Sequence, residues 1–324
     1  MKVYYCIFIN TMEEFLSKCP LPIFEKEKLH LKDEISDGGC NASVFKAKID
    51  DEPCIAKLYD YEYEGWDDED TFLEYFLNVC ENLSYLKDQR STSIIHSVGL
   101  VIEEIDENIQ IYLLTEDLQA EDIYSYIQEE TQWIRSENEK NLQLFSPYVY
   151  YDYNDDIYWS YIKEEQEKLN VLRSMVRCLK QLHDQDYVHL DIKLHNMVIT
   201  KEKEVYLIDY DSITYLYGEK YTEIDSRCGT TGYCANEQWK CIVSKKADIY
   251  SLGVSMIEVW VGEIWCGSRN RKECRNEVLS KLRDIEKHRP ELGKILRKCI
   301  SPQEKDRYTI EKLSKQINKI TLIR

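Results

Sequence analysis

A short segment in the middle of the chain places a carboxylate, an amine and an amide within six positions, at Asp191, Lys193 and Asn196. Transfer of a phosphoryl group to a hydroxyl needs a carboxylate that orients the attacking oxygen and accepts its proton, a cation near the moving phosphate, and oxygen ligands for magnesium. Thirteen residues after Asn196, Asp209 follows the apolar run 205–208. A carboxylate at a strand end can bind a metal that bridges phosphates. The spacing therefore predicts phosphoryl transfer.

The segment Val188–Asn196 resembles the catalytic loop of eukaryotic protein kinases, H-x-D-x-K-x-x-N, and Asp209 stands where that family has the Asp-Phe-Gly aspartate. The resemblance covers about residues 29 to 322. It implies that Asp191 is the catalytic base, that Lys193 neutralises charge on the phosphoryl group, and that Asn196 and Asp209 bind Mg²⁺. The lysine at position 193, two residues after the aspartate, resembles the serine/threonine branch of the family, since tyrosine kinases carry a different residue there.

Other segments resemble the ATP site of the same family, in the same order along the chain. Ile55-Ala56-Lys57 is similar to the third strand with its phosphate-binding lysine, and the segment 35–44 resembles a glycine-rich loop in which Gly39 alone is in register. Thr115 to Leu118 resembles the hinge that faces adenine. The residues for which the resemblance implies contact with ATP are Ile35, Gly39, Val44, Lys57, Glu116, Leu118 and Val198. A helix glutamate should pair with Lys57, and Glu74 is favoured over Glu81.

The segment Gly229–Glu237 resembles the substrate-positioning segment G-T-x-x-Y-x-A-P-E of the family. The resemblance implies that Thr230 bonds Asp191 and Lys193 and takes part in catalysis. It also implies a buried pair between Glu237 and Arg307, and an Asp248 that anchors the catalytic loop from the start of a helix.

Several positions depart from the family pattern. Leu190 replaces the arginine that commonly precedes the catalytic aspartate, so phosphorylation of the activation loop is not expected to be the switch. Asp211 stands in place of the glycine of Asp-Phe-Gly, and we expect it to tolerate an unusual φ. Ile55 replaces an alanine and narrows the expected adenine pocket. Asn236 replaces a proline, and we expect only a modest effect.

Hydrophobic periodicity indicates which elements position these residues. Up to Leu118 the sequence is rich in β-branched and aromatic residues, and one apolar helical stripe over 71–87 interrupts them. Five strands are predicted, at 31–35, 44–47, 53–58, 98–103 and 109–115. Beyond Leu118 helical stripes follow at 171–183 and 248–261, with a strand-and-loop region at 189–211 between them.

These elements and the resemblance predict an α+β chain with a bilobal protein-kinase-like fold. Residues 1–28 are expected to form an N-terminal extension with a short helix near 11–18. A small β-rich lobe should follow at 29–118 and a larger helical lobe at 119–324. A tyrosine- and aspartate-rich insert at about 140–164 is interpreted as a surface excursion between two helices, with a docking role as the alternative.

Charge and cysteine content restrict the partners. The chain of 324 residues has 42 basic and 60 acidic residues, a formal charge of −18, which disfavours nucleic acid and anionic membranes. Its 12 cysteines form no C-x-x-C pair and no zinc spacing, and Cys80 and Cys178 fall in apolar helical patterns. We expect a reducing compartment, the cytoplasm or the nucleus. The expected ligands are ATP, Mg²⁺ and a protein substrate.

Three functions fit these patterns. The first is a serine/threonine protein kinase. The second is a nucleotide-binding pseudokinase scaffold, favoured only by the altered glycine-rich loop. The third is a small-molecule kinase of related fold. Three features argue against it because they resemble parts of a peptide-binding platform: the segment Gly229–Glu237, Asp248 and Arg307.

Overall fold

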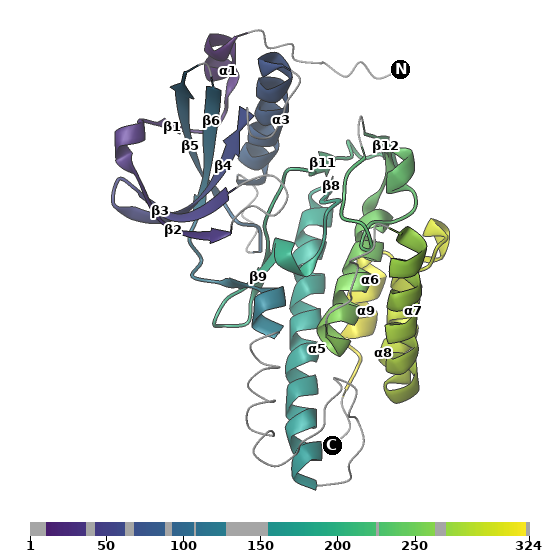
Figure 1. The fold of residues 1–324 in the computed structure, drawn as a ribbon. Helices are drawn as coiled ribbons and strands as arrows, with labels where there is room; N and C mark the ends of the chain where they lie inside the picture. The colour runs from purple at the N-terminus through teal and green to yellow at the C-terminus, as the bar shows by residue number, and fades with distance from the viewer. Residues whose placement is uncertain are drawn as a thin grey trace. The chain divides into compact units, whose positions relative to one another are not determined.

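The structure, a computed structural model, divides into two compact units, one ending at Gln119 and the other beginning at Ala120 (Figure 1). It describes residues 11–36, 43–61, 68–87, 93–106, 108–127, 155–224, 227–262 and 270–321, with side chains of the helix 155–184 described from residue 165 onward. Gly39 and residues 140–154 of the predicted insert lie outside these ranges. A β-sheet unit precedes a mainly helical unit, which confirms the expected α+β organisation.

The first unit is built on a six-stranded sheet of order β1-β5-β6-β4-β3-β2. Its strands are β1 (Ile23–Phe24), β2 (Leu29–Ser36), β3 (Ser43–Ile49), β4 (Glu52–Asp60), β5 (Ser97–Ile105) and β6 (Asn108–Glu116). Only β1 pairs in parallel, with β5, and the other pairs are antiparallel. Each of the five predicted strands lies inside one of β2 to β6, since alternating β-branched residues suit a half-buried strand.

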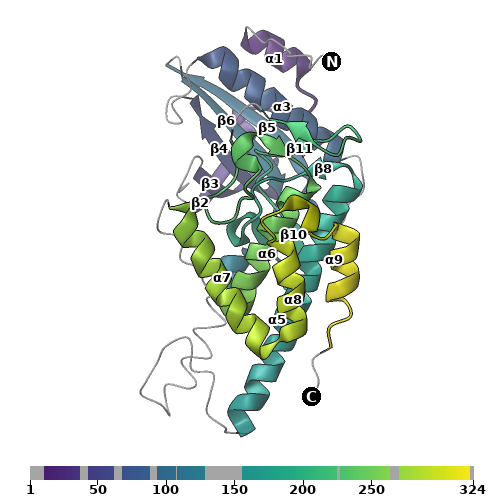
Figure 2. The ribbon, with the colours of Figure 1, turned by 90° about the vertical axis from the view of Figure 1, so that its right-hand side faces the viewer.

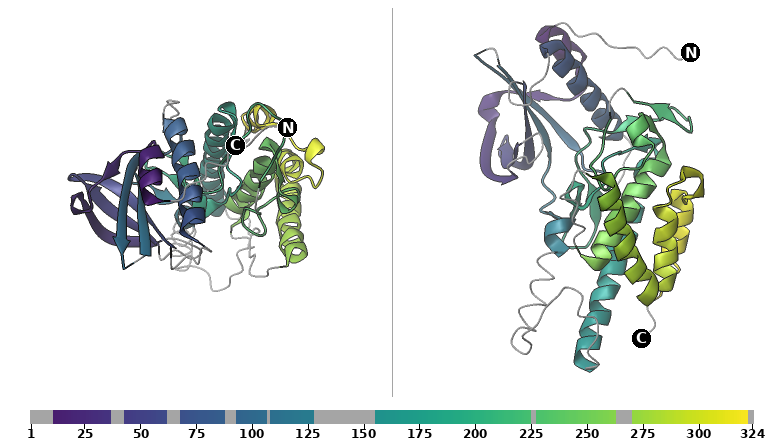
Figure 3. Two further views of the ribbon diagram at one scale, coloured as in Figure 1. Left: turned by 90° about the horizontal axis from the view of Figure 1, so that it is seen from above. Right: turned by 45° about the vertical axis from the view of Figure 1, so that its right-hand side comes forward.

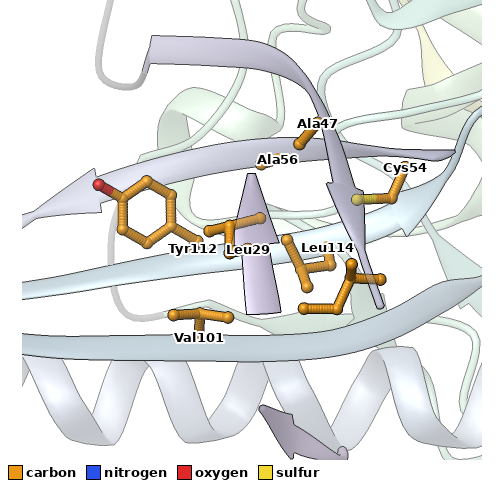
Figure 4. Packing of buried hydrophobic residues seen from close by; sticks show 8 residues of the cluster. Leu29, Ala47, Cys54, Ala56, Val101, Tyr112 and Leu114 are labelled. Carbon is orange, nitrogen blue, oxygen red and sulfur yellow. The ribbon is translucent and has the colours of Figure 1, made fainter. Parts of the chain in front are cut away.

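The two faces of this sheet bury different sets of side chains. Successive residues of a strand point to opposite faces. Cys54 and Ala56 of β4 pack with Leu29, Ala47, Val101, Tyr112 and Leu114 in one buried cluster (Figure 4). Ile55, Lys57 and Tyr59 therefore lie on the other face. The Tyr59 ring meets Phe76 of helix α3 edge to face, with centroids 4.9 Å apart, so α3 covers the face that carries Lys57.

Two helices complete this unit. α3 (Glu69–Lys87) is the predicted apolar helix. α1 (Met12–Lys18) begins after Thr11, whose hydroxyl accepts a hydrogen bond from Glu14 N at 3.2 Å, as an N-cap does. Phe15 of α1 is fully buried with its ring centroid 6.5 Å from that of Phe76. Residues 11–28 thus add α1, β1 and the 3₁₀ helix η1 (Lys26–Lys28) to the sheet unit.

The second unit consists of helices around a few short strands (Figure 2). Its helices are α5 (Asp155–Asp184), α6 (Lys245–Val261), α7 (Arg271–His288), α8 (Pro290–Cys299) and α9 (Ile310–Ile317). α6 is central, because every residue from Ala247 to Trp260 is buried. A helix whose side chains are buried on every face has to be covered on all sides. Helices α7 and α8 lie side by side next to it (Figure 3), joined by the ion pair of Arg297 with Glu286.

The short strands of the second unit flank the predicted catalytic loop. They are β7 (Glu121–Asp122), β8 (Tyr187–Val188), β9 (Met197–Ile199), β10 (Val205–Leu207), β11 (Thr214–Tyr215), β12 (Thr222–Glu223) and β13 (Ile242–Val243). β9 pairs with β10 and β7, and β8 pairs with β11. The described part of this unit also contains three 3₁₀ helices, η2 (Leu194–Asn196), η3 (Gln238–Lys240) and η4 (Glu304–Asp306).

The helix boundaries differ from those predicted in two places. α5 starts at Asp155, so the last part of the tyrosine-rich insert is helical and is not a loop between helices. The apolar stripe that predicted 171–183 marks part of the covered length of α5, in which Glu165 and Leu169 are also buried. α6 starts at Lys245 because the Ser244 hydroxyl accepts a hydrogen bond from Lys246 N at 3.1 Å and caps the helix.

The cysteines at the centre of the second unit should be chemically inert. Cys178 and Cys299 are fully buried, and burial raises the pKa of each thiol to about 12. Only a thiolate reacts readily with alkylating reagents, so iodoacetamide at about pH 8 should leave both unmodified in the folded chain and label both after denaturation. Peptide mass spectrometry measures the labelling, with half-buried Cys241 as the comparison. Equal labelling of Cys178 before and after denaturation would contradict this packing.

No helix among the described residues is long and apolar enough to cross a membrane.

Candidate active site

The predicted catalytic loop is held by a buried carboxylate. Asp248, fully buried in the first turn of α6, accepts hydrogen bonds from the backbone amides of His189 and Leu190 at 2.9 and 2.8 Å. Nε2 of buried His183 lies 2.9 Å from the same carboxylate. Buried amides need acceptors. Asp248 therefore fixes the backbone immediately before Asp191, and the predicted anchor is present.

The loop is also joined to the segment that contains Gly229. Leu190 is buried in the left-handed region at φ +69°, which non-glycine residues seldom adopt. Its carbonyl accepts a hydrogen bond from Gln238 Nε2 at 2.8 Å. Gly229 has φ +97°, and a Cβ there would lie 2.8 Å from the Leu190 oxygen, so only glycine fits. The two segments hold each other in place.

Three polar side chains converge on the carboxylate of Asp191. The Thr230 hydroxyl donates to Asp191 Oδ1 at 2.7 Å and accepts from Lys193 Nζ at 3.0 Å. Lys193 Nζ lies 3.2 Å from Asp191 Oδ2. Asn196 Nδ2 donates to the same Oδ2 at 3.0 Å and to the Asp191 carbonyl at 2.9 Å. The Asp191 side chain is only 17% exposed, and these donors orient its carboxylate.

Replacement of Thr230 by valine is expected to lower kcat about tenfold, because the hydroxyl that orients Asp191 and Lys193 is lost while the side-chain shape is kept. Steady-state phosphorylation assays measure the change, and the exposed Thr321→Val variant is the matched control. An unchanged kcat for Thr230→Val would show that the hydroxyl does not organise the carboxylate.

Two oxygen-bearing side chains, those of Asn196 and Asp209, are of a type that suits a magnesium ion. Asn196 is buried in η2, and since its Nδ2 is committed to Asp191, its Oδ1 is the atom that can bind a metal. The backbone carbonyl of Asn196 accepts a hydrogen bond from Ile208 N at 3.0 Å, which places the residue before Asp209 beside the loop. Amide and carboxylate oxygens are the donors that Mg²⁺ takes in such sites. Among the described residues, no group of three His, Cys, Asp or Glu forms a protein-only metal site.

The turn after β10 has one residue in the left-handed region. This residue is Asp209, at φ +65°, whereas Asp211, which we expected to tolerate an unusual φ, does not need one here. Aspartate tolerates this region better than most residues. Tyr210 fixes the turn, since it is buried, donates to the Leu207 carbonyl at 2.6 Å and packs against His189 with ring centroids 5.6 Å apart.

The end of the segment Gly229–Glu237 is fixed by Arg307. The fully buried guanidinium of Arg307 makes a two-pronged ion pair with Glu237 and donates to the Ser301 and Lys246 carbonyls, each at 2.8 Å. The predicted pair is therefore present. Gln238 adds a link that the sequence did not predict, because its Oε1 accepts from Ala235 N at 2.8 Å while Nε2 binds Leu190. No spacing signal marks a glutamine for such a role.

The predicted ATP residues of the first unit lie on its sheet. Val44 of β3 and Leu113 of β6 are the cross-strand neighbours of Lys57, and Thr115 is the neighbour of Ile55. Lys57 is half-buried, with Nζ 4.7 Å from the Tyr59 ring centroid. Ile35 near the end of β2 is 49% exposed. Glu116 ends β6 and accepts from His96 N at 3.0 Å, and Leu118 follows it.

The remaining predicted residues occupy helix α3 and the second unit. Glu74 is half-buried and Glu81 is exposed on α3, the helix that covers the Lys57 face of the sheet. Their pairing with Lys57 stays a prediction. Val198 is half-buried in β9, between the strands β10 and β7. The predicted adenine contacts are thus on strands or at strand ends.

Comparison with known families gives one match that spans most of the chain. The family model described as "Protein kinase domain" matches residues 35–317. This range contains all the residues that converge at Asp191, together with Lys57, Asp209 and Arg307.

Several curated proteins resemble parts of the chain. One is the serine/threonine-protein kinase PrkC of Bacillus subtilis, 32% identical over 100 residues, which cover 31% of this chain and 15% of that protein. The membrane-associated tyrosine- and threonine-specific cdc2-inhibitory kinase of Drosophila melanogaster is 32% identical over 163 residues, 46% of this chain and 28% of that protein. The maternal embryonic leucine zipper kinase of Xenopus laevis is 31% identical over 100 residues, 30% of this chain and 15% of that protein. The chain thus matches less than a third of the length of each.

Proposed function

This chain belongs to the protein kinase family, and we propose that it transfers the γ-phosphate of ATP to serine and threonine hydroxyls of proteins. The observation that carries the proposal is the convergence of Thr230, Lys193 and Asn196 on the Asp191 carboxylate. Phosphoryl transfer depends mainly on positioning and on electrostatic stabilisation, and this arrangement supplies both around one carboxylate.

In this proposal Asp191 orients the substrate hydroxyl and accepts its proton. Each carboxylate oxygen has about two lone-pair sites. Thr230 binds Oδ1 and Asn196 binds Oδ2, so the carboxylate is oriented but retains acceptor capacity for an incoming hydroxyl. Because the backbone before it is fixed by Asp248, the carboxylate needs little reorganisation when the substrate arrives.

Two lysines are proposed to bind the phosphates of ATP. Lys193 holds its ammonium 3.2 Å from Asp191 and neutralises charge on the group in transfer. Lys57, on the face of the sheet that α3 covers, binds the α- and β-phosphates. Ile35, Gly39, Val44, Glu116, Leu118 and Val198 are assigned to ATP contacts, and Glu74 is assigned to Lys57.

Magnesium fits the donor set of Asn196 Oδ1 and the Asp209 carboxylate, which are hard oxygen ligands. When bound there, the ion would neutralise charge on the β- and γ-phosphate oxygens. The left-handed turn at Asp209, braced by buried Tyr210, presents this carboxylate directly after β10.

Lys193 supports serine and threonine as acceptors, because it is the residue at which the serine/threonine branch differs from the tyrosine kinases. The names of two relatives agree with this assignment in part. PrkC is named a serine/threonine kinase, and the Drosophila protein is named tyrosine- and threonine-specific. Phosphoamino acid analysis of the product tests the choice.

Incubation with radiolabelled ATP and a generic basic protein tests the activity. Label on serine and threonine is the expected result. Nucleotide binding without transfer to any protein would instead favour a pseudokinase scaffold. Transfer to small alcohols but to no peptide would favour a small-molecule kinase.

A further inference from the structure

Two arginines lie over the ring of Trp239, just beyond the segment Gly229–Glu237, and a third lines a hollow beside it. The guanidinium carbon of Arg271 lies 4.4 Å from the Trp239 ring centroid, and that of Arg227 lies 5.9 Å from it. Arg275 follows Arg271 by four residues, so both lie on one face of α7. A shallow hollow is lined by Asn236, Trp239, Tyr250, Arg271 and Arg275, and we name it the arginine hollow.

Where the structure describes the chain, these arginines have no acidic partner of the kind that three other arginines of this unit have. Arg289, Arg297 and Arg307 each form an ion pair with a glutamate. Within the described part of the chain, no carboxylate lies within the 4.0 Å ion-pair limit of Arg227, Arg271 or Arg275. Like charges held close together repel. In a chain of formal charge −18, a positive cluster that has no acidic partner among the described residues suggests that an anion binds to it.

Specific contacts hold the side chains of the arginine hollow in place. Arg271 Nη2 donates to Asn236 Oδ1 at 2.9 Å, which holds the guanidinium against the indole ring. Asn236 stands where the family pattern has proline, a residue that has no side-chain acceptor. Tyr250 is 7% exposed at the base, and burial raises the pKa of its hydroxyl, so this hydroxyl stays a neutral donor. The replacement of the family's proline by Asn236 therefore supplies the acceptor that holds Arg271, which the sequence did not reveal.

The hollow begins close to the proposed reaction centre. Thr230, whose hydroxyl binds Asp191, accepts hydrogen bonds at its carbonyl from the amides of Tyr233 and Cys234, at 3.1 and 3.0 Å. This tight turn brings Cys234, which also lines the hollow, back next to Thr230. A peptide whose hydroxyl reached Asp191 would therefore have a neighbouring residue within reach of Arg271 and Arg275.

We propose that the arginine hollow binds an anionic side chain, phosphorylated or carboxylate, that flanks the acceptor hydroxyl of the protein substrate. This inference rests on the proposed kinase activity. Guanidinium groups bind phosphate and carboxylate through paired N–H donors, and phosphate offers more acceptor oxygens. The enzyme then prefers acidic or already phosphorylated substrates.

Peptides that carry one serine acceptor, with alanine, glutamate or phosphoserine at one flanking position at a time, test this inference. The native chain should favour an anionic residue over alanine at one position by about tenfold or more in kcat/KM. The double variant Arg271→Gln/Arg275→Gln should bring this ratio close to one. Because the ratio is taken within each variant, a general loss of activity cancels. The neighbouring Lys272→Gln variant removes the same charge from an exposed position and should keep the native ratio.

Transfer to all peptides with equal kcat/KM would overturn the inference and leave the kinase activity standing. If no peptide is phosphorylated, fluorescence anisotropy of the phosphoserine peptides decides. Weaker binding by the arginine double variant than by Lys272→Gln supports the hollow, and equal binding overturns it. Loss of activity after phosphatase treatment, with no peptide preference, would assign the anion to a phosphate on the chain itself and would also overturn the proposal.

Discussion

Replacement of Asp191 by asparagine is expected to lower kcat by about 10²–10⁴-fold, because the group that we propose as the acceptor of the hydroxyl proton is lost. The affinity for ATP should stay nearly unchanged, since the substitution keeps the size of the side chain and alters none of the residues assigned to ATP. Phosphate transfer from radiolabelled ATP gives kcat, and calorimetric titration gives the nucleotide affinity.

The Asp284→Asn variant is the matched control, as it makes the same chemical change at an exposed position of α7. It should retain native activity. Thermal unfolding of both variants tests whether the fold keeps its stability when an asparagine amide replaces the carboxylate that contacts Thr230, Lys193 and Asn196. Equal loss of transfer and of ATP binding in Asp191→Asn would argue against the role assigned to this carboxylate.

Replacement of Asp248 by alanine is expected to lower the free energy of unfolding by about 3–5 kcal/mol. The reason is that the buried amides of His189 and Leu190 and the His183 ring lose their shared acceptor, and each buried donor without a partner costs about 1–3 kcal/mol. Urea denaturation followed by circular dichroism measures this change. The kcat of the variant should also fall, because the backbone before Asp191 is no longer fixed.

The Asp184→Ala variant provides the comparison. Asp184 pairs with Lys180 on the surface of α5, with its side chain 52% exposed. Its loss should cost less than about 0.5 kcal/mol, as expected for a solvated ion pair within one helix. Similar stability of the Asp184→Ala and Asp248→Ala variants would mean that the buried carboxylate does not anchor the loop.

Strands and helices were predictable from the sequence where their residue types reflect their burial in the fold. β2 to β6 contain the predicted strands because β-branched and aromatic residues between turn signals favour strands. The start of α5 was not predictable in this way. An apolar stripe marks the covered part of a helix, and Asp155 lies before the stripe begins. Local caps set other ends, as Ser244 does for α6.

At the site, the contacts of Thr230, Asp248 and Arg307 followed from resemblance to the family, and the structure contains them. The conformation of the turn after β10 did not follow. Glycine is the usual marker of a left-handed residue, and the sequence carries no such marker at position 209. The packing of Tyr210 against His189 instead accompanies the left-handed conformation at Asp209.

The sequence by itself determined the types and order of the proposed reacting groups, because several segments that resemble the family follow one another along the chain at matching spacing. It also determined the division into a β-rich part and a helical part. Only the tertiary structure decided that Gln238 ties Leu190 to the neighbouring segment and that Asn236 holds Arg271 against Trp239. Such contacts join residues 35 to 48 positions apart, and packing sets their distances where periodicity and spacing carry no information.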